Sequence, residues 1–317
     1  MSFDGFKAYL DNKECVKIIC GAGNRDFSGI TNLCALYSSA GCRFFDVNPS
    51  VKAIRAAKEG IILSGREKDC FICVSLGTSD DPHFVKCRID SSKCKSCGSC
   101  EKVCLQNAIK DGNGSFVVNT DKCIGCGRCI EACKNDAVET SPEPISISDV
   151  LPALINEGID CVEYHIITED ENGIMEGWKT ITDLYKGPVS VCVDRSKFGN
   201  ERIQKCLKLM KDSCDNLFIV QADGAPMSGG EDDYRTTLQA VAMADIIDKT
   251  GITPYIFISG GTNSKTAELA KLCGLDCTGV SIGSYARKIV KEYIETEDFL
   301  KNKELFGRAL ERAKSIL

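Results

Sequence analysis

Residues 94–104 read CKSCGSCEKVC, and residues 123–133 read CIGCGRCIEAC. Both stretches have the pattern Cys-x2-Cys-x2-Cys-x3-Cys, and eighteen residues separate them. This doubled pattern is typical of proteins with two [4Fe-4S] clusters, in which the fourth cysteine of each run binds the cluster of the other run. We therefore expect two ligand sets: Cys94, Cys97, Cys100 and Cys133 for cluster I, and Cys123, Cys126, Cys129 and Cys104 for cluster II.

Zinc is the alternative for paired Cys-x2-Cys motifs. A zinc site needs four ligands, but it does not account for two four-cysteine runs that exchange their fourth ligands, so the pattern favours iron–sulfur clusters. Thirteen of the 21 cysteines lie outside the two runs, most of them in apolar stretches where a free thiol behaves as a small hydrophobe. This distribution argues against a disulfide framework and for a reducing compartment.

The composition is that of an ordinary globular protein of 317 residues, with 43% hydrophobic and 26% charged residues. A net charge of −6 offers no basic surface for nucleic acid or for an anionic membrane. No apolar run is long enough to span a bilayer, and the N-terminus MSFDGFKAYLDNKE resembles neither a secretory signal nor a transit peptide. We expect a cytoplasmic protein.

Short apolar runs alternate with amphipathic stretches along the rest of the chain, which indicates βα units and a parallel sheet. The sequence predicts strands over residues 15–20, 43–47, 70–76, 161–166, 188–194, 216–222, 253–259 and 277–282. Helices are expected between them, for example over residues 31–40, 51–59, 145–157, 201–212 and 236–249, and a last helix within residues 297–317.

The spacing of the eight strands predicts the domain organisation. Successive strands start 24 to 37 residues apart, except for 91 residues between the third and the fourth. This excess is the size of a two-cluster ferredoxin, so the sequence predicts a (β/α)8 TIM-like barrel with a ferredoxin module inserted after strand 3. The barrel would comprise residues 1–77 and 142–317, and the module residues 78–141. A doubly wound open sheet is the main alternative.

An insertion after the third strand would place the clusters at the C-terminal face of the barrel, where barrel active sites lie. Several polar residues near strand ends are candidates to line a pocket there: Lys17, Asp46, Asn48, Glu163, His165, Asp194, Gln221, Asp223 and Ser259. Glu163, His165 and Asp194 are the candidates for proton transfer. The alternative is that some of these charges form structural ion pairs inside the barrel, such as Lys17 with Glu163.

The loops after the last two strands have the composition of a phosphate site. They contain Ser259, Gly260 and Gly261, followed by Gly283, Ser284 and Arg287. Glycines allow close approach of the backbone, a helix N-terminus favours an anion, and an arginine adds a direct charge. This arrangement resembles the phosphate grip of barrels that bind flavin mononucleotide (FMN), although a Gly-Gly turn is also a common helix entry.

Several stretches together resemble the light-dependent period protein A family. They are KIICGAG at residues 17–23, DPHF at 81–84, the two cysteine runs, QADGAPMSGG at 221–230, ISGGTN at 258–263 and GSYARK at 283–288. Members of that family have a ferredoxin region and a distinctive C-terminal domain, and in oxygenic phototrophs they are associated with relaying redox state to the circadian clock. The resemblance implies two [4Fe-4S] clusters and a role in electron transfer or redox sensing.

The sequence leaves three functions open. The first is electron transfer or redox sensing, with a redox partner protein or a small-molecule electron donor or acceptor. The second is a barrel oxidoreductase in which FMN receives single electrons from the clusters, because a flavin converts one-electron steps into hydride chemistry. The third is a sensor whose barrel only binds a quinone or a phosphate-containing ligand.

Overall fold

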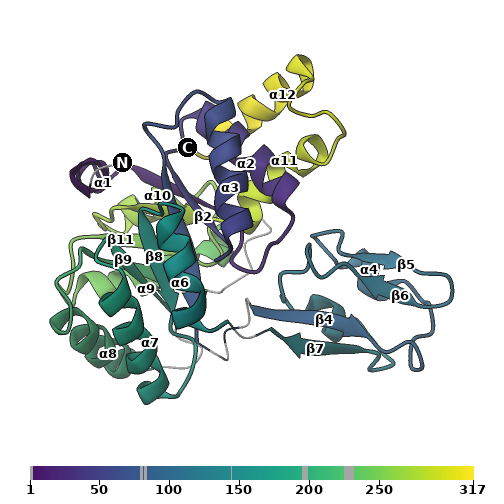
Figure 1. Cartoon of the computed structure of the whole chain (residues 1–317), viewed down its shortest axis with the longest axis horizontal. Helices are drawn as coiled ribbons and strands as arrows, with labels where there is room; N and C mark the ends of the chain where they lie inside the picture. Colours follow the sequence, from purple (N-terminus) through teal and green to yellow (C-terminus); the bar gives the residue numbers. More distant parts are fainter. Residues whose placement is uncertain (1–2, 79–80, 82–83, 144, 195–198, 225–231) are drawn as a thin grey trace.

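The computed structural model describes residues 3–78, 81, 84–143, 145–194, 199–224 and 232–317. Eight parallel strands form a closed barrel, in the order in which they follow one another along the chain (Figure 1). They are β1 (Cys15–Ile19), β2 (Phe44–Val47), β3 (Phe71–Gly77), β8 (Cys161–His165), β9 (Val189–Val193), β10 (Phe218–Asp223), β11 (Ile256–Ser259) and β12 (Gly279–Ile282). Because β1 pairs with both β2 and β12, the sheet closes, which confirms the barrel over an open sheet.

Helices follow the barrel strands and cover the outside of the sheet. They are α2 (Phe27–Ala40), α3 (Val51–Leu63), α6 (Ile147–Asn156), α7 (Glu171–Leu184), α8 (Asn200–Asp212), α9 (Tyr234–Asp248), α10 (Thr266–Leu272), α11 (Ser284–Ile294) and α12 (Lys303–Lys314). The last helix begins later than residue 297, because the Asn302 side chain caps it by accepting a hydrogen bond from the Leu305 amide. Among the described residues, no helix combines the length and apolarity needed to cross a membrane.

The cysteine runs lie in a small module between β3 and β8, which are neighbours in the barrel. Its elements are β4 (Val85–Ile89), α4 (Ser99–Lys102), β5 (Ile109–Asp111), β6 (Phe116–Val118), α5 (Arg128–Glu131) and β7 (Val138–Pro142). The antiparallel pair β4–β7 closes the module at its two ends, and Figure 1 shows the module standing beside the barrel. The predicted insertion after the third barrel strand is therefore confirmed.

The inside of the barrel changes from apolar to polar along the strands. At one end, Phe44, Phe71 and Phe257 pack against Phe6 of a helix that the sequence analysis does not predict, α1 (Phe3–Asp11). Phe6 lies 5.0 Å from Phe44 and 4.8 Å from Phe71, between ring centroids. This helix covers the N-terminal end of the barrel, and the polar side chains inside the barrel lie toward the opposite end, the mouth.

The module is attached to the barrel beside the second cysteine run. The backbone amide of Arg25 donates to the Asp121 carbonyl at 2.8 Å, and its guanidinium pairs with Glu143 at 2.6 Å. The ammonium of the buried Lys86 donates to the carbonyls of Gly23 in the barrel and Cys123 in the module. These bonds hold the Cys123 loop against the end of β1.

Candidate functional site

The cysteines of the two runs line two separate cavities. Cys94, Cys97, Cys100 and Cys133 line the first, and Cys104, Cys123, Cys126 and Cys129 line the second. These are the two groups that the sequence analysis predicts, including the exchange of Cys104 and Cys133. Four thiols around one cavity are the donor set of a [4Fe-4S] cluster, so the residues present fit one cluster at each place.

Glycines allow the chain to wrap around each cavity. Gly98 and Gly127 precede α4 and α5 with φ of +74° and +75°, a left-handed conformation that residues with a Cβ rarely adopt. The two cavities differ in depth, because Cys97 is exposed in the first whereas Cys123 and Cys129 are buried in the second. The first cavity therefore offers the more accessible route for electrons from outside.

The second cavity contains a fifth cysteine that sequence spacing does not reveal. Cys87 on β4 is buried, lines this cavity, and lies 3.5 Å from Cys129 between sulfur atoms. Its thiol also hydrogen-bonds to Cys123. When Cys123 and Cys129 are thiolate ligands, Cys87 is the thiol that can donate its one proton to either of them, and such a hydrogen bond helps to set the reduction potential of a cluster.

We expect Cys87→Ala to make cluster II harder to reduce, because the variant loses a hydrogen bond that stabilises the more negative, reduced state. A redox titration followed by electron paramagnetic resonance would show a more negative potential for cluster II and an unchanged potential for cluster I. Cys87→Ser, which keeps a donor, should shift cluster II less. Equal potentials in all three proteins would contradict this role.

The mouth of the barrel is a cavity that the Cys123 loop helps to close. Glu163, His165, Gln221, Asp223 and Ser259 from strand ends line it, together with Ile124 from the module. Ile124 and Ser284 line both this cavity and the second cysteine cavity. Cluster II would therefore be separated from the barrel mouth only by the side chains between two adjoining cavities.

Glu163 is the centre of a buried hydrogen-bond network inside the mouth. One carboxylate oxygen, Oε2, accepts from Lys17 at 2.5 Å and from Ser190 at 3.0 Å. The other, Oε1, accepts from Gln221 at 2.8 Å and lies 3.3 Å from His165 Nε2. The predicted structural ion pair between Lys17 and Glu163 is thus present, and His165 is part of the same network.

His165 is held between two carboxylates, since its Nδ1 lies 2.9 Å from Asp81, at the point where the chain leaves the barrel for the module. Burial lowers the pKa of His165, but Asp81 and Glu163 outweigh it and raise that pKa well above its ordinary value. Burial likewise raises the pKa of Glu163, but Lys17 and His165 outweigh it and lower that pKa to about 2. The pair is therefore ionised at neutral pH, with the proton on the imidazole.

Asp46 also lines the mouth, next to this network, and its negative charge is disfavoured there. Its carboxylate accepts from Ser75 at 2.8 Å, and burial followed by the negative charge of Glu163 raises its pKa to about 6. The third proton-transfer candidate, Asp194, is buried one residue beyond β9. It is not among the described residues that line the mouth.

The raised pKa of Asp46 makes stability depend on pH. The protonated form is favoured in the fold, so its contribution is complete below the unfolded pKa of about 4 and is lost as pH rises through about 6. Between pH 5 and 8 we expect the free energy of unfolding to fall by roughly 1 kcal/mol from this group. Asp46→Asn should flatten this dependence in urea titrations, whereas the exposed Asp69→Asn should not. A wild-type pH profile in the Asp46→Asn protein would show that the assignment is wrong.

The predicted phosphate residues lie together at the mouth. Ser259, Gly260, Gly261, Gly283, Ser284 and Arg287 all line the cavity, which has a volume of about 70 Å³. Arg287 donates from Nη1 to the Ile19 carbonyl at 2.6 Å, while its buried Nε has no hydrogen-bond partner within the described part of the chain. Residues 225–230 of the QADGAPMSGG stretch lie outside the described residues.

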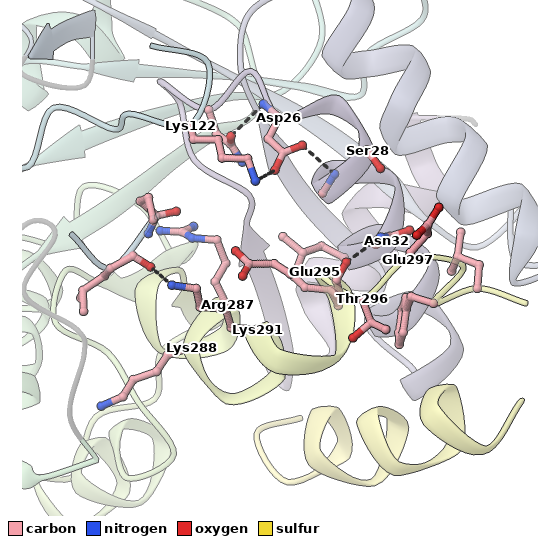
Figure 2. A pocket seen from close by; sticks show the side chains of 18 of the residues that line it. Asp26, Ser28, Asn32, Lys122, Arg287, Lys288, Lys291, Glu295, Thr296 and Glu297 are labelled. Atoms are coloured by element: carbon pink, nitrogen blue, oxygen red, sulfur yellow. Dashed lines mark hydrogen bonds and ion pairs between the residues drawn. The ribbon is translucent and has the colours of Figure 1, made fainter. Parts of the chain in front are cut away.

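Ser284 and Arg287 also line a larger groove of about 660 Å³ between the module and the barrel (Figure 2). In Figure 2, Lys122 of the module and Asp26 of the barrel lie on one side, paired at 3.5 Å. Lys291 of α11 donates to the Leu105 carbonyl at 2.5 Å, next to Cys104. The groove thus runs from the barrel mouth to the edge of the second cysteine cavity.

Three residues that the sequence analysis does not single out complete the site: Cys87, Lys86 and Ile124. Each acts through a contact between distant parts of the chain, and the local sequence carries no signal for such contacts. Asp81 lies in the DPHF stretch, but its partnership with His165 likewise depends on a separation of 84 residues.

Comparison with known proteins identifies two regions. The model of the light dependent period A C-terminal domain matches residues 153–317, and that of the 4Fe-4S binding domain matches residues 88–110 and 116–139. No curated protein matches the chain.

Similar solved structures show distant likeness only. They include tryptophan synthase from M. tuberculosis in its aminoacrylate-bound form, 9% identical over 99% of this chain and 99% of that chain, with a TM-score of 0.49. Dihydrodipicolinate synthase from Oceanobacillus iheyensis is 12% identical over 96% and 80%, with a TM-score of 0.41. A truncated 3-deoxy-D-arabino-heptulosonate 7-phosphate synthase from Thermotoga maritima is 10% identical over 94% and 84%, with a TM-score of 0.46.

Proposed function

Because this chain belongs to the light dependent period A family and contains a 4Fe-4S binding domain, we propose that it is a redox relay with two [4Fe-4S] clusters. Electrons enter at cluster I, pass to cluster II and reach the mouth of the barrel, which responds to the redox state of cluster II. The cluster I ligands are Cys94, Cys97, Cys100 and Cys133, and the cluster II ligands are Cys104, Cys123, Cys126 and Cys129.

One observation carries this proposal: Ile124 and Ser284 line both the cluster II cavity and the barrel mouth. A change in the charge of cluster II would therefore occur close to buried ionisable groups, above all the Glu163–His165 pair, whose charges respond to it. The exposed Cys97 marks the opposite end of the relay, where a redox partner protein or a small-molecule donor would approach. The thirteen cysteines outside the two runs are free thiols, most of them buried, and support a cytoplasmic location.

The relay predicts that both clusters are reduced and reoxidised without any added substrate. Reduction should also change amide hydrogen exchange in β1, in the Cys123 loop and at the start of α11, because these segments meet at the mouth. The outer helix α8 serves as the internal control. If the clusters are reduced and reoxidised with no change in hydrogen exchange at the mouth, the protein is only an electron carrier. Clusters that cannot be reduced would overturn the proposal.

A second function is favoured by the groove of about 660 Å³ beside the mouth. It has the size of a small-molecule pocket, whereas the mouth cavity of about 70 Å³ is too small for a flavin ring. A flavin or a quinone with a phosphate-containing tail could lie in the groove, with its anionic group at Ser284 and Arg287. The protein would then be a flavin-dependent oxidoreductase or a ligand-binding sensor.

Titration of the cluster-loaded protein with FMN tests this second function. Arg287→Met should weaken binding, while Lys205→Met, which changes an exposed residue of α8 outside the groove, should bind as the wild type does. Absence of FMN binding by the wild type would exclude the flavin form and leave the relay in place.

A further inference from the structure

Beside the eight cluster cysteines of the module, the inside of the barrel contains a second group of metal-binding donors. Glu163 and His165 lie two residues apart on β8, and Cys192 is the β-ladder partner of His165 on β9. One ligand atom from each of the three side chains lies within 4.8 Å of the other two, and all three residues are buried. Nitrogen, oxygen and sulfur donors thus lie close together inside the barrel, and two of the three residues, Glu163 and His165, also line the mouth.

Each donor is oriented by a further group. His165 Nδ1 is held by Asp81 at 2.9 Å, which leaves Nε2 facing Glu163. Glu163 Oε2 is occupied by Lys17 and Ser190, which leaves a lone pair of Oε1 on the His165 side. The Cys192 sulfur lies 3.5 Å from the amide nitrogen of Gln221. Metal ligands in proteins are held in this way, by a carboxylate behind the histidine and hydrogen bonds behind the other donors.

The spacing fits a tetrahedral ion. His165 Nε2 and Glu163 Oε1 lie 3.3 Å apart, and two ligands at about 2.0 to 2.1 Å from a tetrahedral zinc ion would be separated by about that distance. An ion would take the place of the proton that these two atoms now share. The Cys192 sulfur lies within 4.8 Å of a ligand atom of each of these residues and would move closer to reach about 2.3 Å from the same position.

We propose that Glu163, His165 and Cys192 bind one divalent transition-metal ion of the zinc class, separate from the iron–sulfur clusters. A mixed nitrogen, oxygen and sulfur set suits borderline ions such as Zn²⁺ and Fe²⁺. Three protein ligands leave a fourth position, and Glu163 and His165 line the mouth cavity from which a water molecule or a substrate could fill it. This is the arrangement of a catalytic ion rather than a structural one. The imidazolium proton and the thiol proton leave as the ion enters.

Co²⁺ titration of the full chain tests this site. The protein is first loaded with both clusters under anaerobic conditions, so that the eight cluster cysteines are occupied, and is then dialysed against a chelator. We expect one equivalent of Co²⁺ to bind, with the visible bands of a tetrahedral ion and a near-ultraviolet sulfur-to-cobalt band. Cys192→Ala should abolish the sulfur band, and Asp81→Asn should weaken binding about 10- to 100-fold while keeping it.

The matched control is Cys73→Ala, which removes a buried barrel cysteine outside the three-residue group. It should bind Co²⁺ as the wild type does. Iron content, sulfide content and far-ultraviolet circular dichroism identify any variant that fails to fold. Absence of stoichiometric Co²⁺ binding by the wild type, or an unchanged sulfur band in Cys192→Ala, would show that Glu163 and His165 form only a buried ion pair.

Discussion

Cys104→Ala should lose cluster II and keep cluster I, although Cys104 belongs to the first cysteine run. Cys133→Ala should lose cluster I and keep cluster II. The reason is geometric, since Cys104 lines the cavity of the second run and Cys133 lines the cavity of the first. Each variant should contain about four irons instead of about eight. Iron and sulfide analysis, with electron paramagnetic resonance of the reduced protein, identifies the cluster that remains.

The shift in reduction potential caused by Cys87→Ala shows which cluster each of the two variants keeps. In Cys133→Ala the surviving cluster is II, so its potential should still respond to Cys87→Ala, whereas the surviving cluster I of Cys104→Ala should not respond. Cys273→Ala, which removes an exposed thiol of the barrel, is the control and should keep both clusters. Loss of cluster I in Cys104→Ala would show that each run binds a cluster with its own four cysteines.

Lys17→Met should destabilise the barrel by about 3 kcal/mol or more, because it leaves Glu163 buried without its strongest partner. Lys17 and Glu163 are almost completely inaccessible, and their charged atoms lie 2.5 Å apart. The Lys17 ammonium also lies 5.5 Å and 5.7 Å from the ring centroids of Phe44 and Phe257, so methionine keeps much of the packing. Urea unfolding followed by circular dichroism measures the loss.

An exposed pair with the same distance is the control. Lys249 lies 2.5 Å from Asp245 on α9, with most of its side chain in solvent, so Lys249→Met should change the free energy of unfolding by less than about 1 kcal/mol. Lys17→Met combined with Glu163→Gln should recover part of the loss, since no unpaired charge remains. Equal effects of Lys17→Met and Lys249→Met would mean that the buried network does not stabilise the barrel.

The barrel could be predicted because its strands carry a local signal. Each of the eight strands is a short apolar run, and the single long interval between the third and fourth locates the insertion. The cysteine grouping could be predicted for the same reason, since spacing along the chain determines it. The sequence does not predict the α1 helix, although Phe6, Tyr9 and Leu10 have helical spacing, because nine residues are too few for the period to identify a helix.

The polar residues of the site could be predicted, but the contacts between residues that are far apart in the sequence could not. Polar residues at strand ends indicate a lined mouth, and Glu163, His165 and Gln221 do line it. That Asp81 holds His165, and that Ile124 closes the mouth, depends on how the module is placed against the barrel. Long-range placement of this kind follows from packing, which a single sequence does not display.

Anaerobic purification followed by measurement of iron, acid-labile sulfide, zinc and flavin in one sample tests the central claim most directly. The two-cluster account predicts about eight irons and about eight sulfides per chain, with both clusters reduced reversibly in the same sample. Stoichiometric flavin in addition would favour the oxidoreductase. About two zinc ions per chain with no sulfide would contradict the account, because the cysteine cavities would then be structural zinc sites.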